Sequence, residues 1–223
     1  MKLLMAGLVA LVLLVGCVDY KEKLNLKEDG TGTVVMDIIM SLENNAQPTT
    51  VEKIKEEFSA IEGITFKSAD VKTKDKEQFI HIECGFANID AFMKISTTQL
   101  GQTGIIGTMT FDKKDDGTFA YTRKVNITPG NEKYNWTFTT HLPGAIESSN
   151  ADAANVKKGS GVVEWTYNIV KNTGEQNMEA VVKPGAGGMN PMILIIVGVG
   201  LVVIIGVVVA VVLLKKKKVP AAE

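Results

Sequence analysis

The feature that most constrains this chain is an uninterrupted apolar run from Pro191 to Leu214. A helix needs about 20 apolar residues to cross the hydrocarbon core of a bilayer, so this run is long enough. In lipid a helix satisfies every backbone polar group internally. Lys215 to Lys218 follow at once, and the positive-inside rule places such a cluster in the cytoplasm. We therefore predict a retained transmembrane helix over 191–214 and a basic cytoplasmic tail over 215–223.

The first residues have the organisation of a bacterial lipoprotein signal. Lys2 gives a positive start, Leu3 to Val15 is apolar, and Gly16 precedes Cys17. This pattern resembles the lipobox, in which diacylglycerol is attached to the thiol and the peptide is cut before the cysteine. We predict a signal peptide over 1–16 and fatty acylation, for instance with palmitate, at Cys17. The alternative is an uncleaved signal anchor with an incidental cysteine.

Both ends predict the same topology. A lipid-modified Cys17 lies on the outer side of the cytoplasmic membrane, and the C-terminal lysines lie on the inner side. The intervening segment, 17–183, is then extracytoplasmic, and the glycine-rich stretch 184–190 is a linker. Within the span, Gly206 and Ala210 form a small-xxx-small pair that can let two helices approach.

Alternating apolar residues, the signature of strands, dominate the segment 17–183. Tyr20 to Leu26 and Thr33 to Met40 flank an Asp29-Gly30 turn and predict a hairpin. Further strands are expected at 64–71, 79–86, 104–111, 118–127, 134–141, 161–170 and 178–183. A helix is expected from Thr49, opened by a Thr49–Glu52 capping box and ended by Gly63, and a short one over 88–95. The predicted fold is an α+β, mainly antiparallel, strand-rich domain with one or two helices.

The composition argues against an enzyme. The net charge of −1 gives no reason to expect a nucleic-acid partner. There are two histidines and two cysteines, and no phosphate-binding or nucleophile motif is present, so we predict no cofactor and no metal site. Cys84 is expected to face the core as a small apolar residue, and His81 and Glu83 to lie on the solvated face of the same strand.

The order of these features resembles that of bacterial lipoproteins with an LppM-like domain. The features are the Gly16-Cys17-Val18 start, the Asp29-Gly30 hairpin, the helix near 49–61, His141-Leu142-Pro143-Gly144 with the following Glu147-Ser148-Ser149-Asn150, and the strand that carries Trp165. The resemblance implies an extracytoplasmic α+β domain similar in shape to lipid-binding proteins.

The leading functional hypothesis is a non-enzymatic module that recognises a membrane lipid or glycolipid at the outer face of the membrane. An apolar groove between a helix and the sheet would provide the site, and these residues alternatively form a closed core. The candidate lining residues are Val51, Ile54, Phe58, Met36 and Ile38. The second hypothesis is a scaffold or accessory subunit that binds an envelope protein.

Overall fold

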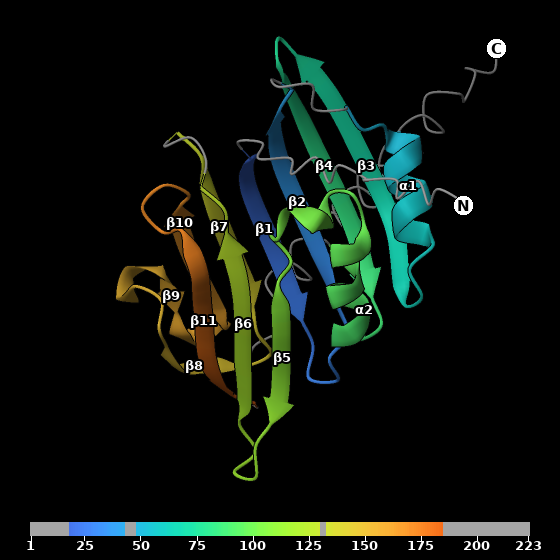
Figure 1. Ribbon diagram of the computed structural model, residues 1–223. Coiled ribbons are helices and arrows are strands. Elements are labelled where there is room, and N and C mark those ends of the chain that lie inside the picture. Colours follow the sequence, from blue (N-terminus) through green and yellow to red (C-terminus); the bar gives the residue numbers. More distant parts are fainter. Residues whose placement is uncertain (1–17, 43–47, 130–132, 185–223) are drawn as a thin grey trace, which may run out of the picture. The chain divides into compact units, whose positions relative to one another are not determined.

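The computed structural model describes residues 18–42, 48–129 and 133–184 (Figure 1). The predicted signal peptide, Cys17, residues 185–190 of the linker, the span at 191–214 and the tail lie outside these residues, and their assignments stay predictions. Within the three described ranges, no helix is both long enough and apolar enough to span a membrane.

The described domain consists of two β-sheets and two α-helices, which confirms the predicted α+β class (Figure 1). The larger sheet has seven strands in the order β3-β4-β2-β1-β7-β10-β9, with bounds β1 Val18–Leu26, β2 Gly32–Ser41, β3 Ile64–Lys74, β4 Glu77–Phe86, β7 Asn135–His141, β9 Val156–Lys157 and β10 Val162–Asn168. The smaller sheet has four strands in the order β5-β6-β11-β8, with bounds β5 Thr108–Lys113, β6 Phe119–Ile127, β8 Ala145–Ser149 and β11 Gly174–Lys183. The helices are α1 Val51–Ser59 and α2 Ile89–Met93.

The first hairpin forms as the sequence predicts. β1 and β2 pair antiparallel from Val18 opposite Met40 to Leu26 opposite Gly32. At the turn, Gly30 adopts a φ of +76°, a conformation that favours glycine, and the Asp29 carboxylate accepts bonds from Thr31. The other edge of β1 pairs with β7 in parallel, which no local pattern in the sequence announces.

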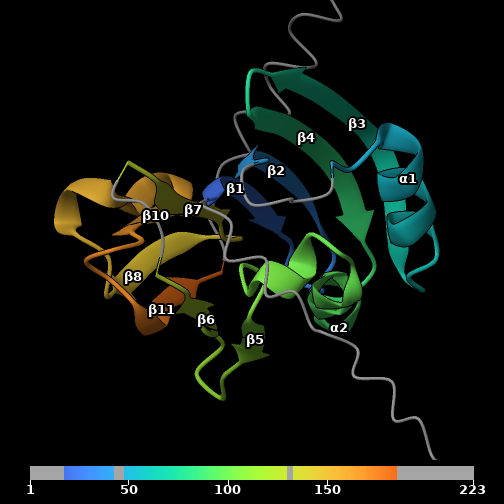
Figure 2. The same cartoon turned by 45° about the horizontal axis from the view of Figure 1, so that its top comes forward.

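One face of the seven-stranded sheet carries the core, and no element among the described residues covers the other, which we call the open face. The helices and the four-stranded sheet lie on the same side of the larger sheet (Figures 1 and 2). The buried apolar side chains of both sheets and both helices form one continuous cluster. The opposite face bears mainly polar and charged side chains, as expected for a mainly antiparallel sheet with one solvated face.

Helix α1 begins one residue later than the predicted capping box requires. The cap is Thr50, whose hydroxyl accepts a bond from the Lys53 amide at 3.2 Å. The box based on Thr49 and Glu52 is therefore wrong, because Thr49 is buried and its backbone pairs instead with the Gln78 side chain. The sequence predicts that Gly63 ends the helix. Gly63 follows α1 with a φ of +86°, the left-handed conformation that this role requires.

Three other assignments differ from the sequence prediction. The segment expected as a strand from Gly104 becomes one only at Thr108, and Ile105 and Ile106 lie buried in the preceding loop. Strand β8 was not expected, because its sequence lacks a clear apolar alternation. It forms along β11, which supplies its hydrogen-bonding partner. Strand β9 has two residues, too few for a pattern to show.

We predict that Thr50→Ala lowers the free energy of unfolding by about 1 kcal/mol, because it removes the side-chain acceptor at the start of α1. The two tryptophans of the chain, Trp136 and Trp165, both lie in the described domain and report its unfolding by fluorescence in denaturant. Thr50→Ser keeps the hydroxyl and should retain nearly full stability. Equal losses in the two variants would contradict the capping role.

Candidate functional site

The most unusual polar feature of the domain is a pair of opposite charges inside its core. Glu22 lies on β1 between Tyr20 and Leu24, and Arg123 lies on β6 between Tyr121 and Val125, each on the buried face of its strand. Both side chains are fully buried. Neither residue is among the site residues that the sequence predicts, although each strand shows one charge in the middle of an apolar alternation and the two signs are opposite.

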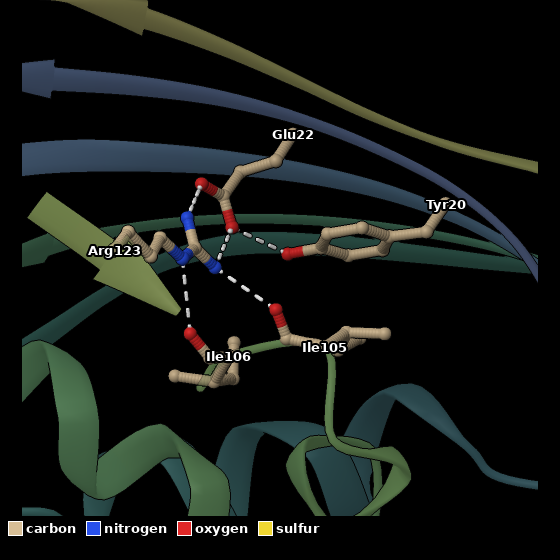
Figure 3. Close-up of polar contacts among 5 residues, drawn as sticks. All are labelled: Tyr20, Glu22, Ile105, Ile106 and Arg123. Carbon is tan, nitrogen blue, oxygen red and sulfur yellow. Dashed lines mark hydrogen bonds and ion pairs between the residues drawn. The ribbon is translucent and has the colours of Figure 1, made fainter. Parts of the chain in front are cut away.

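The two side chains form a bidentate ion pair (Figure 3). Arg123 Nη2 donates to Glu22 Oε2 at 3.0 Å, and Nη1 donates to Oε1. The Tyr20 hydroxyl donates a third bond to Glu22 Oε2 at 2.6 Å. Parallel bonds between a guanidinium and a carboxylate are among the stronger hydrogen bonds in proteins. Through this contact the larger sheet is bonded to the smaller sheet.

The remaining donors of Arg123 bind the loop before β5. Its Nε donates to the Ile106 carbonyl at 3.0 Å and its Nη2 to the Ile105 carbonyl at 2.9 Å (Figure 3). The loop reaches this position because Gly107 has a φ of +66° and lies against Lys124, where an added Cβ would meet the Lys124 carbonyl oxygen at 1.9 Å.

Aromatic rings flank the guanidinium. Its carbon lies 4.7 Å from the ring centroid of Phe138 on β7 and 5.3 Å from that of Phe92 on α2. Both distances suit cation–π attraction, which is stronger in a desolvated site. Arg123 therefore contacts the larger sheet, α2 and the loop before β5, in addition to its own strand.

This cluster is suited to holding structure and not to reacting with a substrate. Burial alone would lower the pKa of Arg123, but the Glu22 carboxylate opposes that effect and the pKa is raised. Burial and the same carboxylate raise the pKa of Tyr20 well above its ordinary value. Both groups therefore keep their protons at neutral pH, and neither Glu22 nor Arg123 is accessible to solvent.

A second polar cluster occupies the open face of the larger sheet. His81 Nδ1 on β4 lies 2.6 Å from Asp37 Oδ1 on β2, and Lys72 bonds Asp70 within β3 at 2.5 Å. They surround a shallow hollow of about 290 Å³ to which Phe79, 37% exposed, also contributes. His81 and Glu83 lie on this solvent-facing side, as the sequence predicts. Nowhere in the described ranges do His, Cys, Asp and Glu residues gather into a group that could hold a metal ion.

The predicted groove residues lie in closed packing. Met36, Ile38, Ile54 and Phe58 are each 1–3% exposed and belong to the continuous core, whereas Val51 at the start of α1 is half-buried. A lipid could contact these four residues only after the closed packing around them had opened. Cys17, the predicted acylation site, lies outside the described residues, immediately before the first residue of β1.

The chain was compared with protein families, curated proteins and solved structures. No protein-family model and no curated protein matches the chain. The chain is similar to the folded domain of LppM from Mycobacterium tuberculosis, determined by NMR, with 11% sequence identity and a TM-score of 0.49. The alignment covers 76% of this chain and 91% of that chain. This similarity does not show membership of a family, and lipoprotein status stays a prediction.

We predict that removing either partner of the buried ion pair costs about 3–5 kcal/mol of unfolding free energy, because an uncompensated charge is left in the core. Glu22→Leu and Arg123→Met test this by denaturant titration. The double variant should recover more than half of the summed loss, since no charge then remains buried. Lys67→Met serves as the control because it breaks an exposed ion pair with Glu83, which is worth less than about 1 kcal/mol. Strictly additive losses would contradict the coupling.

We predict that Cys84 does not react with iodoacetamide at pH 8 in the folded protein. The thiol is buried in the core, as expected from the sequence, and burial together with the Glu22 charge raises its pKa to about 12. The thiolate, which is the reactive form, is then scarce and enclosed. Peptide mass spectrometry should find Cys84 modified only after unfolding in urea. Rapid labelling of the native chain at this residue would contradict the packing described for β4.

Proposed function

We propose that this chain is a non-enzymatic bacterial envelope lipoprotein whose extracytoplasmic domain binds the acyl part of a membrane lipid or glycolipid at the outer face of the cytoplasmic membrane. The observation that carries the proposal is the position of the predicted acylation site. Cys17 immediately precedes Val18, the first residue of a strand that pairs with neighbours on both of its edges. Without an intervening linker, acylation would hold the folded domain directly against the bilayer.

The architecture supports α1 as the element that would admit an acyl chain. It has nine residues, and only Ile54 and Phe58 are fully buried. Burying such side chains contributes about 1.5–3 kcal/mol each, and small units of this kind open at a lower cost than the whole domain. The four-stranded sheet is held more firmly, because Arg123 bonds it to Glu22.

Methionines in the core favour an adaptable site. Met36 and Met40 are buried on β2, and Met93 packs at the end of α2. Their unbranched side chains can repack around an inserted chain more readily than β-branched residues can. A core that contains such side chains can adjust to acyl chains of different shapes.

A fatty acid that carries both a diazirine and an alkyne tests the proposal in one experiment on the full chain. Cells that express the chain are fed this fatty acid, and half of the sample is irradiated. Label present without irradiation reports covalent acylation, and it should be lost in Cys17→Ser and kept in Cys84→Ser. Label that requires irradiation reports bound lipid, and we expect it on peptides that contain residues 34–40 and 51–58.

The two readouts fail separately. Light-independent label that persists in Cys17→Ser would contradict acylation at Cys17. Light-dependent label confined to 191–214 would mean that lipid only surrounds the predicted span, and would contradict binding by the domain. As a matched comparison, the open-face variant Phe79→Ser leaves the core intact and should not change the labelled peptides.

A further inference from the structure

The open face of the seven-stranded sheet carries two neighbouring rows of side chains. Each row is complementary in charge to the same row in reversed order. The first row runs across β3, β4, β2 and β1 as Lys72, Phe79, Ile39 and Asp19. The second runs across the same strands as Asp70, His81, Asp37 and Lys21. In each row the two ends carry opposite charges. The middle is apolar in the first row and holds the bonded His81–Asp37 pair in the second.

We propose that this face is the interface of a homodimer, with its two-fold axis parallel to the strands and between β4 and β2. Such an axis places each position of a row opposite the mirror position of the same row in the second copy. Lys72 then faces the second copy's Asp19, and Asp70 faces its Lys21. Both charge pairs are repeated on the other side of the axis, so four attractive pairs form from two rows.

The centre of the first row is apolar. The side chain of Phe79 is 37% exposed. Among the large apolar side chains in the described ranges, only Val170 is exposed as well. Across the axis Phe79 would pack on Ile39 of the second copy, and an aromatic residue near the middle of an interface contributes most to binding. The hollow around Phe79 gives this contact a recess to fill.

The geometry tolerates the twist of the sheets. Packed sheets align their strands to within about 30°. The outer strands β3 and β1 lie about 7 Å from the axis, given a spacing of about 4.8 Å between neighbouring strands. A rotation of 30° displaces their side chains by about 4 Å, a distance that a lysine side chain can cover.

The area indicates a weak dimer. Four strands at about 4.8 Å spacing and about ten residues of 3.3 Å each cover about 600 Å² per partner. That value is at the low end for a stable complex, so confinement of both copies to one membrane would strengthen association. The two-fold axis along the strands also leaves Val18 of both copies at the same end, as two lipid anchors in one bilayer would require.

Charge reversal on the full chain in detergent tests the proposal, with mass measured by sedimentation velocity. Asp70→Lys brings like charges together across the axis, and so does Lys21→Asp. Each single variant should weaken dimerisation at least tenfold, and the double variant should restore it. Asp112→Lys makes the same charge change on β5 of the other sheet and should leave dimerisation unchanged. Trp fluorescence in denaturant confirms that every variant folds.

Three outcomes would overturn the proposal. The first is a monomer at all concentrations, with or without a lipid that co-purifies. The second is a dimer that neither single charge reversal weakens. The third is a dimer lost in Gly206→Leu but not in the charge-reversal variants, which would assign association to the predicted transmembrane segment.

Discussion

The buried ion pair between Glu22 and Arg123 is the interaction on which the arrangement of this domain depends. Two residues 101 positions apart in the chain each place one charge in the core, and neither charge could remain there without the other. Their bond joins the two sheets, and the spare donors of Arg123 bind the carbonyls of Ile105 and Ile106. The pair therefore restricts how the two sheets are matched, because another arrangement would leave a charge without its partner in the core.

The contacts that hold the four-stranded sheet in place differ from those that hold helix α1. Arg123 on the four-stranded sheet donates charge-assisted bonds to Glu22 on the larger sheet and to the carbonyls of the loop before β5. Helix α1, in contrast, is held chiefly by the burial of Ile54 and Phe58 and by the Glu57 carboxylate, which accepts a bond from the Gln99 amide at 2.9 Å. The proposed lipid site needs α1 to move while the two sheets stay in register.

The open face of the larger sheet follows from the same architecture. All covering elements lie on one side, so the other side must be compatible with water or with a partner. Cross-strand neighbours of opposite charge already stabilise a sheet in water. The charged side chains of the open face also match those of a second copy about the proposed two-fold axis. They are Lys72, Asp70, Asp19 and Lys21.

The sequence by itself determined the strand-rich α+β class, the first hairpin and its Asp29-Gly30 turn, the burial of Cys84 and the exposure of His81. These depend on local rules, namely a period of two along a strand and a glycine where φ is positive. Only the tertiary structure decided that Thr50 and not Thr49 caps α1, that β1 pairs with β7, and that Glu22 meets Arg123. Alternation states which face of a strand a side chain occupies, but the partner on that face is set by packing between elements far apart in the chain.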